Sequence, residues 1–404
     1  MTDTLRGFRI VDLTRMLAGP YATMLLADMG AEVIKVESSD GDPMRGMGPP
    51  FEPDGRSAYF MAVNRNKRSV VLDLRDEHDR DRLLRLVSTA DAVVDNFRAG
   101  VMERLRLTPE HLRAVKPDLV TCSMTAFGSD GPYRDLPAYD LVLQAMGGGM
   151  SITGEPGGRP TRAGIPVGDL AGGAFAALAL CAALLSRERN HQGQHIDLSL
   201  LDVQVSLLTY VAQYFVTDGQ VPGPVGSAHQ SIVPYQAFRT ADGDVVVAVF
   251  GENFWTPLCR VMGLEELIDC YPDNATRHAH RQEVTERLQA RFLERTTDEW
   301  VDAIWEAGVP GGPVNTVDRV LRDPQVRHRQ MVVSDGEREL LGNPIKTGAA
   351  DSFTPAPRLG QHNSEYLGEG GRPAGGRVHP GRRSPGSPRN HQISWRGSGG
   401  VPPK

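Results

Sequence analysis

Short apolar runs alternate with longer segments of helical composition over the first half of the chain. Phe8–Leu13 and Ala31–Glu37 have the apolar content of strands, and Gly19–Met29 between them has that of a helix. A strand, a helix and a strand in such close succession predict a parallel βαβ unit with a right-handed crossover. Further strands are expected over Val70–Leu74, Ala92–Asp95, Leu119–Met124 and His195–Ser199. The pattern therefore predicts an α/β fold with a Rossmann-like, doubly wound sheet.

The longest apolar segment, residues 170–185, contains Gly172 and Gly173. A membrane-spanning helix needs about 20 apolar residues, so we expect a buried core helix over residues 170–187. The N-terminal residues lack the cationic and apolar segments of a secretory signal. The four cysteines form no CxxC pair and no metal-ligand spacing. We therefore expect a cytoplasmic protein with no membrane partner and no metal site.

A change of composition after the alternating pattern predicts further parts of the chain. Residues 218–227 are rich in Gly and Pro, as in a linker. Residues 228–318 begin with two strands joined by a tight turn and continue with helical segments, which predicts a small α+β domain. Residues 370–404 combine Gly, Pro and basic residues with too little apolar content to pack, so we expect a disordered basic tail.

Length and charge limit the class of protein. A chain of 404 residues exceeds the usual size of one domain, and 40% hydrophobic with 23% charged residues are ordinary globular values. The 44 Lys and Arg against 50 Asp and Glu give a formal charge of −6. This charge is too acidic for a protein whose main task is to coat nucleic acid. We expect no nucleic-acid partner, and any anionic ligand needs a local cluster of cations.

Asp169 is the best local candidate for chemistry. It stands within Gly164–Gly173, between small residues at the start of the predicted core helix. An Asp at this place is ordinarily an N-cap, which accepts hydrogen bonds from the first free amides of the helix. A helix N-terminus also stabilises a carboxylate, and flanking glycines give a substrate carbonyl room to approach a carboxylate nucleophile. The local residues leave both interpretations open and favour the N-cap.

A second candidate is a group of cationic side chains near the expected strand ends. Arg75 and Arg104 follow predicted strands, and residues 64–68 precede one. Ligands usually bind at the carboxyl ends of parallel strands, and Arg there suits phosphate groups. Solvated surface charge explains these residues equally well. The first βα turn, residues 12–20, lacks the GxGxxG motif of dinucleotide sites, so a nicotinamide cofactor is not expected.

Seven short segments together resemble the class III CoA-transferases (CaiB/BaiF type), the family of formyl-CoA transferase, carnitine CoA-transferase and, by relationship, α-methylacyl-CoA racemase. The resemblance extends from about residue 5 to residue 368. Each segment alone is weak, but their order and spacing are specific. The segments are Asp12–Pro20, Gly30–Glu37, Asn64–Ser69 with Leu72–Leu74, Asp95–Phe97, Gly128–Tyr133, Gly168–Asp169 and Gly193–Asp197.

The resemblance implies a large Rossmann-like domain built from both ends of the chain, a smaller α+β domain, and a homodimer of interlocked rings. The large, CoA-binding domain would consist of residues 1–217 and a return segment at 319–369, which is too short to form a domain alone. The tail at 370–404 departs from the usual short ending of the family.

The resemblance also implies an activity, the transfer of CoA from an acyl-CoA thioester to a free carboxylic acid. The Asp169 carboxylate would form first a mixed anhydride and then an aspartyl-CoA thioester, so that no ATP is needed and water must be excluded. Acyl-CoA and a small carboxylic acid are the expected partners, with CoA as a substrate and no permanently bound cofactor. The alternatives are an acyl-CoA racemase or isomerase of the same fold and a non-catalytic CoA-binding protein.

Residue by residue, the resemblance implies a CoA site and a substrate pocket. The CoA-binding positions are Ala18, Leu72, Arg75, Asn96, Phe97 and Arg104. The substrate-pocket positions are Arg15, Leu17, Tyr139 and Asp140. Racemase relatives carry a histidine where this chain has Tyr139. A phenol is a poorer proton shuttle than an imidazole at neutral pH, so transfer is favoured over racemisation.

Two departures from the formyl-CoA transferases bear on the substrate. Those enzymes carry a His and a Gln where this chain has Arg15 and Leu17, and a glycine run where it has Phe250–Trp255. Oxalate and formate are therefore not expected as substrates. We expect a larger carboxylic acid, with Arg15 meeting the second carboxylate of a dicarboxylate such as succinate.

Overall fold

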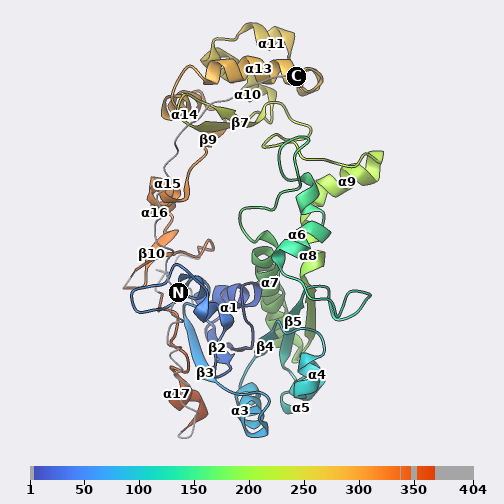
Figure 1. Cartoon of the computed structure of the whole chain (residues 1–404), viewed down its shortest axis with the longest axis vertical. Helices are drawn as coiled ribbons and strands as arrows, with labels where there is room; N and C mark the ends of the chain where they lie inside the picture. The colour runs from blue at the N-terminus through green and yellow to red at the C-terminus, as the bar shows by residue number, and fades with distance from the viewer. Residues whose placement is uncertain (1–3, 337, 347–352, 369–404) are drawn as a thin grey trace, which may run out of the picture.

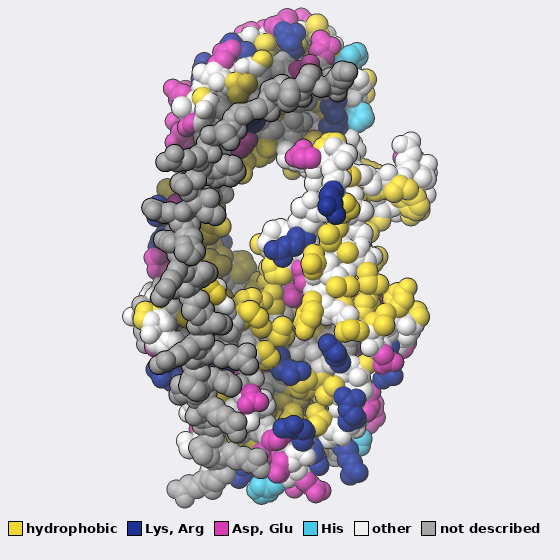
Figure 2. Space-filling model, viewed as in Figure 1, with side chains coloured by type: hydrophobic (Ala, Val, Ile, Leu, Met, Phe, Trp, Pro, Cys, Tyr) yellow, Lys and Arg dark blue, Asp and Glu magenta, His cyan; other side chains and the backbone are white. Residues whose placement is uncertain are grey.

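The computed structural model describes residues 4–336, 338–346 and 353–368. These residues form a body around a parallel sheet and a smaller body around an antiparallel sheet, joined by two connections (Figure 1). An opening passes through the molecule between the two connections (Figure 2). The tail predicted at 370–404 lies outside the described residues.

The larger body contains six parallel strands in the order β3–β2–β1–β4–β5–β6. Val11 of the central strand pairs with Ile34 on one side and Val93 on the other. The strand order reverses between β1 and β4, which is where ligands bind in open α/β sheets. The prediction of an α/β fold is confirmed. The strands are β1 (Arg9–Asp12), β2 (Glu32–Glu37), β3 (Lys67–Val71), β4 (Ala92–Asp95), β5 (Val120–Thr125) and β6 (His195–Ser199).

Alternate strand side chains enter two apolar cores. Ile10 packs beneath α1 (Ala18–Asp28) and α7 (Val167–Asn190) on one face of the sheet. Val11 packs beneath α3 (Glu77–Ser88) and α5 (Pro109–Val115) on the other. Because helices cover both faces, strand side chains on either side of the sheet meet an apolar core. The other helices of this body are η1 (Pro43–Gly46), α2 (Ala58–Ala62), α4 (Val101–Leu105), α6 (Asp140–Met146), η2 (Gly149–Ile152), α8 (Leu200–Leu207) and α9 (Thr209–Asp218).

Helix α7 is the predicted core helix, and it packs closely on α1. A side chain at Gly173 would place its Cβ 2.6 Å from the carbonyl oxygen of Ala18, so only glycine allows this approach. Among the described residues, α7 alone has the length and apolar composition of a membrane-spanning helix, and 44% of its apolar window is buried. The helix belongs to the core, as expected, but only on one side, since Phe175 and Leu178 are 43% and 66% exposed.

The smaller body has an antiparallel sheet of β7 (Tyr235–Arg239), β8 (Asp244–Ala248) and β9 (Gly311–Pro313). Its core is built around the fully buried side chains of Trp255, Phe292 and Trp300. The third strand was not predicted, because Gly and Pro have low strand propensity. The helices of this body are α10 (Glu252–Met262), α11 (Glu266–Cys270), α12 (Asn274–Ala279), α13 (Arg281–Phe292) and α14 (Thr297–Glu306).

The last described residues return to the parallel sheet and cover the edge of β3. The Asn363 side chain accepts a hydrogen bond from the Val71 amide at 2.8 Å. His362 accepts one from the Ser69 amide at 3.1 Å and donates one to the Ser69 carbonyl at 3.0 Å. The elements on this path are α15 (Val317–Arg322), α16 (Pro324–His328), β10 (Val332–Ser334), β11 (Glu339–Leu341) and α17 (Asn363–Leu367). The domain boundaries given above stay a prediction.

Strand β3 differs from its predicted position, since it begins at Lys67 and ends at Val71 rather than spanning 70–74. A turn ends it: the Asp76 amide donates to the Asp73 carbonyl at 2.9 Å. The sequence did not indicate that the strand begins at Lys67, because this residue is charged. Its side chain is buried by an ion pair with Asp12, which lies far from it in the sequence.

Candidate active site

A cavity of about 500 Å³ lies at the carboxyl edge of the parallel sheet, beside the point where the strand order reverses. Its walls come from the loops after β1, β4 and β5 and from the first turn of α7. Eight of the eleven predicted site residues line this cavity: Arg15, Leu17, Ala18, Asn96, Phe97, Arg104, Tyr139 and Asp169. The fold therefore brings together residues that lie as far as 154 positions apart in the sequence.

Asp169 stands in the first turn of α7 and is partly buried in the cavity wall. No hydrogen bond or ion pair engages its carboxylate among the described residues, and the residue at the N-cap position of α7 is Pro166, not Asp169. The N-cap interpretation of Asp169 is therefore wrong. Burial, and next the negative charge of Asp140, raise the pKa of the Asp169 carboxyl to about 7. Near neutral pH this group is a more basic carboxylate than an ordinary Asp.

Asp140, at the start of α6, does not line the cavity. Only 8% of it is exposed, and one oxygen accepts hydrogen bonds from the amides of Gly168 and Asp169 at 2.9 and 3.2 Å. Its other oxygen accepts one from Gln144 at 2.5 Å. The structure thus places Asp140 behind the α7 N-terminus rather than among the cavity-lining residues predicted for it.

Arg15 is exposed in the cavity, and its backbone is fixed by Asn96. The Arg15 amide donates to Asn96 Oδ1 at 2.8 Å, and Asn96 Nδ2 donates to the Arg15 carbonyl at 2.7 Å. The guanidinium lies 5.0 Å from the centre of the Phe97 ring, within the range of a cation–π contact. Within the described chain, Arg15 has no acidic partner. Asn96 therefore orients Arg15, and the Arg15 charge remains available to an anion.

The other predicted pocket residues line the cavity to different degrees. Leu17 and Ala18 are 7% and 4% exposed and form its apolar wall. Tyr139 is 65% exposed at the mouth, directly before α6. Phe250, in the segment that replaces a glycine run of the formyl-CoA transferases, is 76% exposed on the smaller body and does not line this cavity.

A second cavity of about 610 Å³ adjoins the first and shares Arg15, Phe97, Val101 and Arg104 with it. The two predicted residues Leu72 and Arg75 line this second cavity. Leu72 is only 1% exposed and belongs to its floor. Arg75 binds Asp73 through two hydrogen bonds of 3.0 Å, whereas Arg104 has no acidic partner in the described part of the chain. The two cavities form one elongated site, and Arg15 and Arg104, neither with an acidic partner in the described residues, lie where they meet.

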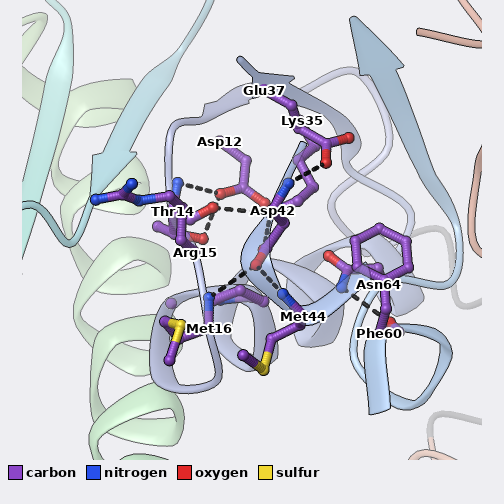
Figure 3. Close-up of polar contacts among 12 residues, drawn as sticks. Asp12, Thr14, Arg15, Met16, Lys35, Glu37, Asp42, Met44, Phe60 and Asn64 are labelled. Atoms are coloured by element: carbon purple, nitrogen blue, oxygen red, sulfur yellow. Dashed lines mark hydrogen bonds and ion pairs between the residues drawn. The ribbon is translucent and has the colours of Figure 1, made fainter. Parts of the chain in front are cut away.

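A network of buried charges lies beneath the β1–α1 loop that carries Arg15 (Figure 3). Lys35 lies 2.9 Å from Asp42 and donates to the Thr14 carbonyl at 2.7 Å. Asp42 in turn accepts hydrogen bonds from the amides of Met16 and Met44 at 3.3 and 3.0 Å. These contacts hold the loop at Met16, whose φ of 72° is costly for a residue with a side chain.

Asp12 and Lys67 form the second half of the network. The Lys67 ammonium lies 3.1 Å from Asp12 and donates to the Pro20 carbonyl at 2.9 Å. Thr14 and Thr23 donate further hydrogen bonds to the Asp12 carboxylate. Burial alone would raise the pKa of Asp12, but Lys67 and Lys35 hold it below its usual value. Burial lowers the pKa of Lys67 to about 8, although the Asp12 charge opposes this change.

Sequence reasoning missed this network and one aromatic neighbour of Asp169. Tyr59 lies on α2, and burial together with the charges of Asp169 and Asp42 raises the pKa of its phenol. Lys35 stands inside the buried strand β2, and its charge there was the available signal, whereas Lys67 is the first residue of β3 and is followed by Arg68. No cluster of His, Cys, Asp and Glu that could hold a metal ion occurs in the described residues.

Comparison with known proteins places these features in a family. The model of CoA-transferase family III matches residues 5–363. Succinate–glutarate CoA-transferase of Agrobacterium fabrum is 39% identical, with 90% of this chain and 95% of that protein covered. Succinyl-CoA:mesaconate CoA-transferase of Haloarcula marismortui is also 39% identical, with 91% and 96% covered.

The fold agrees with the sequence match. The crystal structure of a CaiB/BaiF family protein from Brucella suis superimposes with a TM-score of 0.83 at 37% identity, covering 91% of this chain and all of that one. The family model and these relatives span both bodies and both cavities. The chain therefore belongs to CoA-transferase family III.

Proposed function

We propose that this CoA-transferase moves CoA from an acyl-CoA thioester to a free carboxylic acid through covalent intermediates on Asp169, without ATP. The observation that carries the proposal is the Asp169 carboxylate itself, which lies in the cavity with no counter-ion or hydrogen-bond donor among the described residues. A buried carboxylate without partners is a costly arrangement. It suits a nucleophile, whose pKa near 7 gives it more basicity than an ordinary Asp.

The steps balance without an outside energy source. An Asp169 oxygen attacks the thioester carbonyl, the C–S bond breaks, and the products are an aspartyl acyl anhydride and CoA thiolate. The thiolate attacks the aspartyl carbonyl of that anhydride, which releases the donor acid and leaves an aspartyl-CoA thioester. The acceptor carboxylate then attacks the aspartyl-CoA thioester, which gives a second mixed anhydride and CoA thiolate. The thiolate attacks the acceptor carbonyl of this anhydride, which forms the new acyl-CoA and restores the Asp169 carboxylate. Both anhydride and thioester are lost if water enters, so the partly enclosed cavity matters.

The elongated site supports binding of CoA along the carboxyl edge of the sheet. Arg104 provides an unpaired cation where the two cavities meet, and Arg75, which is paired with Asp73, lies on the outer side. Phe97 provides an aromatic face shared by both cavities. We infer that the phosphates lie toward Arg75 and Arg104, and that the thioester lies toward Asp169.

We propose a dicarboxylic acid as acceptor, with Arg15 binding the carboxylate that does not react. Arg15 carries the charge, Asn96 fixes its backbone, and no acid on the described chain neutralises it. The relatives' names agree in substrate class: succinate with glutarate, and succinyl-CoA with mesaconate or D-citramalate. Racemisation is not favoured, because Tyr139 stands where racemases place their histidine.

We propose that two copies interlock as rings to form the working enzyme. An opening passes through the molecule, and apolar side chains gather over the elements beside it (Figure 2). Leu178, Tyr210 and Val216 on α7 and α9 are 66%, 50% and 72% exposed. Large exposed apolar patches on a protein surface often mark contacts with another chain. Light scattering with size-exclusion chromatography should give twice the chain mass, and a monomer at all concentrations would contradict this arrangement.

Covalent trapping tests the proposed mechanism. The protein is mixed with succinyl-CoA and quenched with hydroxylamine, which converts an aspartyl anhydride or thioester into a hydroxamate. Mass spectrometry of the digest should find this modification on Asp169. Asp135→Asn is the matched control, because Asp135 lines the same cavity and its loss should leave the label in place. Absence of label on Asp169 across a panel of acyl-CoA donors would refute the mechanism.

A further inference from the structure

The first turn of α7 has its amides satisfied by a residue from another helix. The first amides of any helix lack intrahelical partners and are usually capped by a side chain just before or within the first turn. In α7 the nearby acid is Asp169, yet its carboxylate makes no such bond. The amides of Gly168 and Asp169 both donate to one oxygen of Asp140, which lies 28 and 29 positions earlier.

The surroundings of Asp140 fix it in this role. Its second oxygen accepts a hydrogen bond from Gln144 one turn further along α6, and the Gln144 oxygen accepts one from the Ala163 amide at 2.9 Å. The last contact ties the segment before α7 to α6. Gly168 completes the site, since a Cβ there would lie 3.0 Å from Asp140 Oδ1 and would also meet the buried amide of Gln204.

We propose that Asp140 is a positioning residue for the proposed transfer reaction: by capping α7 from outside, it leaves the Asp169 carboxylate free to face the cavity. This inference rests on the proposed function and deepens it. The division of labour needs two carboxylates, one that takes the helix amides and one that reacts. An Asp169 that capped its own helix would share its oxygens with the amides and lose nucleophilicity.

The same geometry places a negative charge behind the nucleophile. Two carboxyl groups in one partly buried region oppose each other's ionisation, and the Asp140 charge adds to burial in raising the pKa of Asp169. Asp140 thus makes Asp169 more basic as well as free.

Other titratable groups face the same helix or the same cavity. On the elements packed against α7 they are Tyr21 and Asp28 on α1, Cys122 on β5, His195 and Asp197 on β6 and Asp202 on α8. In the cavity and on α2 they are Arg15, Arg98, Arg104, Arg134, Asp135, Tyr139 and Tyr59. Asp28 pairs with Arg65, and Asp197 with Ser129, so these two acids are already engaged elsewhere.

The decisive variant is Asp140→Asn, which keeps an acceptor oxygen for the two amides but removes the charge. The acid limb of the pH profile of kcat should move to lower pH by about one unit, because the Asp169 carboxylate then persists to lower pH. A residue with a structural role alone would lower the amount of folded enzyme without moving this midpoint. Asp140→Ala removes the acceptor as well, and kcat should fall about 100-fold with the KM for acyl-CoA nearly unchanged.

A readout without turnover keeps the test independent of activity. The rate of carbodiimide modification of Asp169, followed by mass spectrometry across pH, reports the ionisation of that carboxyl in wild type and in Asp140→Asn. Asp273→Asn is the matched control, because Asp273 caps α12 on the smaller body and accepts from the Thr276 amide at 2.7 Å. It should leave both the pH profile and the modification curve unchanged.

The outcomes separate the two proposals. Wild-type enzyme that carries no covalent label on Asp169 would refute the mechanism, whatever Asp140 does. Labelled, active wild-type enzyme would refute the role of Asp140 alone if Asp140→Ala kept the kcat of wild type and Asp140→Asn kept its pH profile and modification curve. A shift in Asp140→Asn toward lower pH, absent in Asp273→Asn, supports it.

Discussion

Two buried aspartates, Asp12 and Asp169, lie at the same edge of the sheet and have opposite surroundings. Asp12 is wholly buried against Lys67, Lys35 and threonine hydroxyls, and the pKa of its carboxyl is held low. Asp169 is partly buried beside another carboxylate and has no cationic partner in the described chain, and its pKa is raised to about 7. Burial raises the pKa in both places, so the counter-ions decide which carboxylate is structural and which is reactive.

This difference shows how the fold divides two tasks between neighbouring loops. The Asp12 network fixes the β1–α1 loop, which presents Arg15 to the cavity. The α7 N-terminus presents Asp169 to the same cavity. Stability should therefore depend on the first site, and chemistry on the second.

Exchanging the reactive carboxylate should give the largest effect. Asp169→Asn should lower kcat by at least about 10⁴-fold, as removal of a catalytic carboxylate does elsewhere. Unfolding by urea should show no loss of stability, because the side chain has no partner to lose. The measurement pairs a CoA-transfer assay with a denaturation curve. An Asp169→Asn variant that kept a tenth of the wild-type activity would contradict the catalytic role of Asp169.

The opposite result is expected at Asp12. Asp12→Asn leaves Lys67 and Lys35 buried without their counter-charge, and breaking a buried ion pair costs about 3–5 kcal/mol. The midpoint of urea unfolding should fall accordingly. The enzyme that remains folded should still acquire the covalent label on Asp169. Unchanged stability would show that the network is not what holds the loop.

Arg15 lies between the two regions, on the loop held by one and inside the cavity of the other. Arg15→Ala removes a charge-assisted contact worth about 1.5–3 kcal/mol, so the KM for a dicarboxylic acceptor should rise about 10- to 100-fold. A monocarboxylic acceptor of equal length should be affected far less. Equal effects on both acids would contradict the assignment of Arg15 to the second carboxylate.

A change of pH should affect the two aspartates differently, with smaller effects than the substitutions have. Below pH 7 the Asp169 carboxylate is protonated and lost as a nucleophile, so kcat should fall about tenfold per pH unit. The pKa of Asp12 is depressed in the folded state, so its contribution to stability is present above the unfolded pKa of about 4 and is lost as the pH falls further. Activity should therefore decline between pH 7 and 5. Because the pKa of Asp169 is higher in the folded state than in the unfolded chain, its protonation favours the folded state, so the midpoint of a thermal melt should stay constant or rise over this range. A melt whose midpoint fell together with activity would remove the contrast.

Apolar periodicity is a local signal, and it identified the sheet strands and the α7 helix. Local residues alone favoured an N-cap for Asp169, and the resemblance of seven ordered segments to a family implied its catalytic role and the residues that line its cavity. The roles of Asp140 and Asn96 depend on which backbone amides lie opposite them after folding. The partners of Lys35 and Lys67 likewise come from other elements, so their pairing has no signature along the chain. Arg75 lies where predicted, but Asp73 already occupies its guanidinium.

The late-synthesised residues that cover the edge of β3 have a consequence for folding during synthesis. Asn363 and His362, which cover Val71 and Ser69, leave the ribosome almost 300 residues after that strand. Throughout that interval an unpaired row of amides and carbonyls faces the surrounding medium, and such edges invite pairing with other chains. Deletion of the last stretch of the described chain should therefore lead to aggregation during expression, even though every residue of the cavity would already have been made.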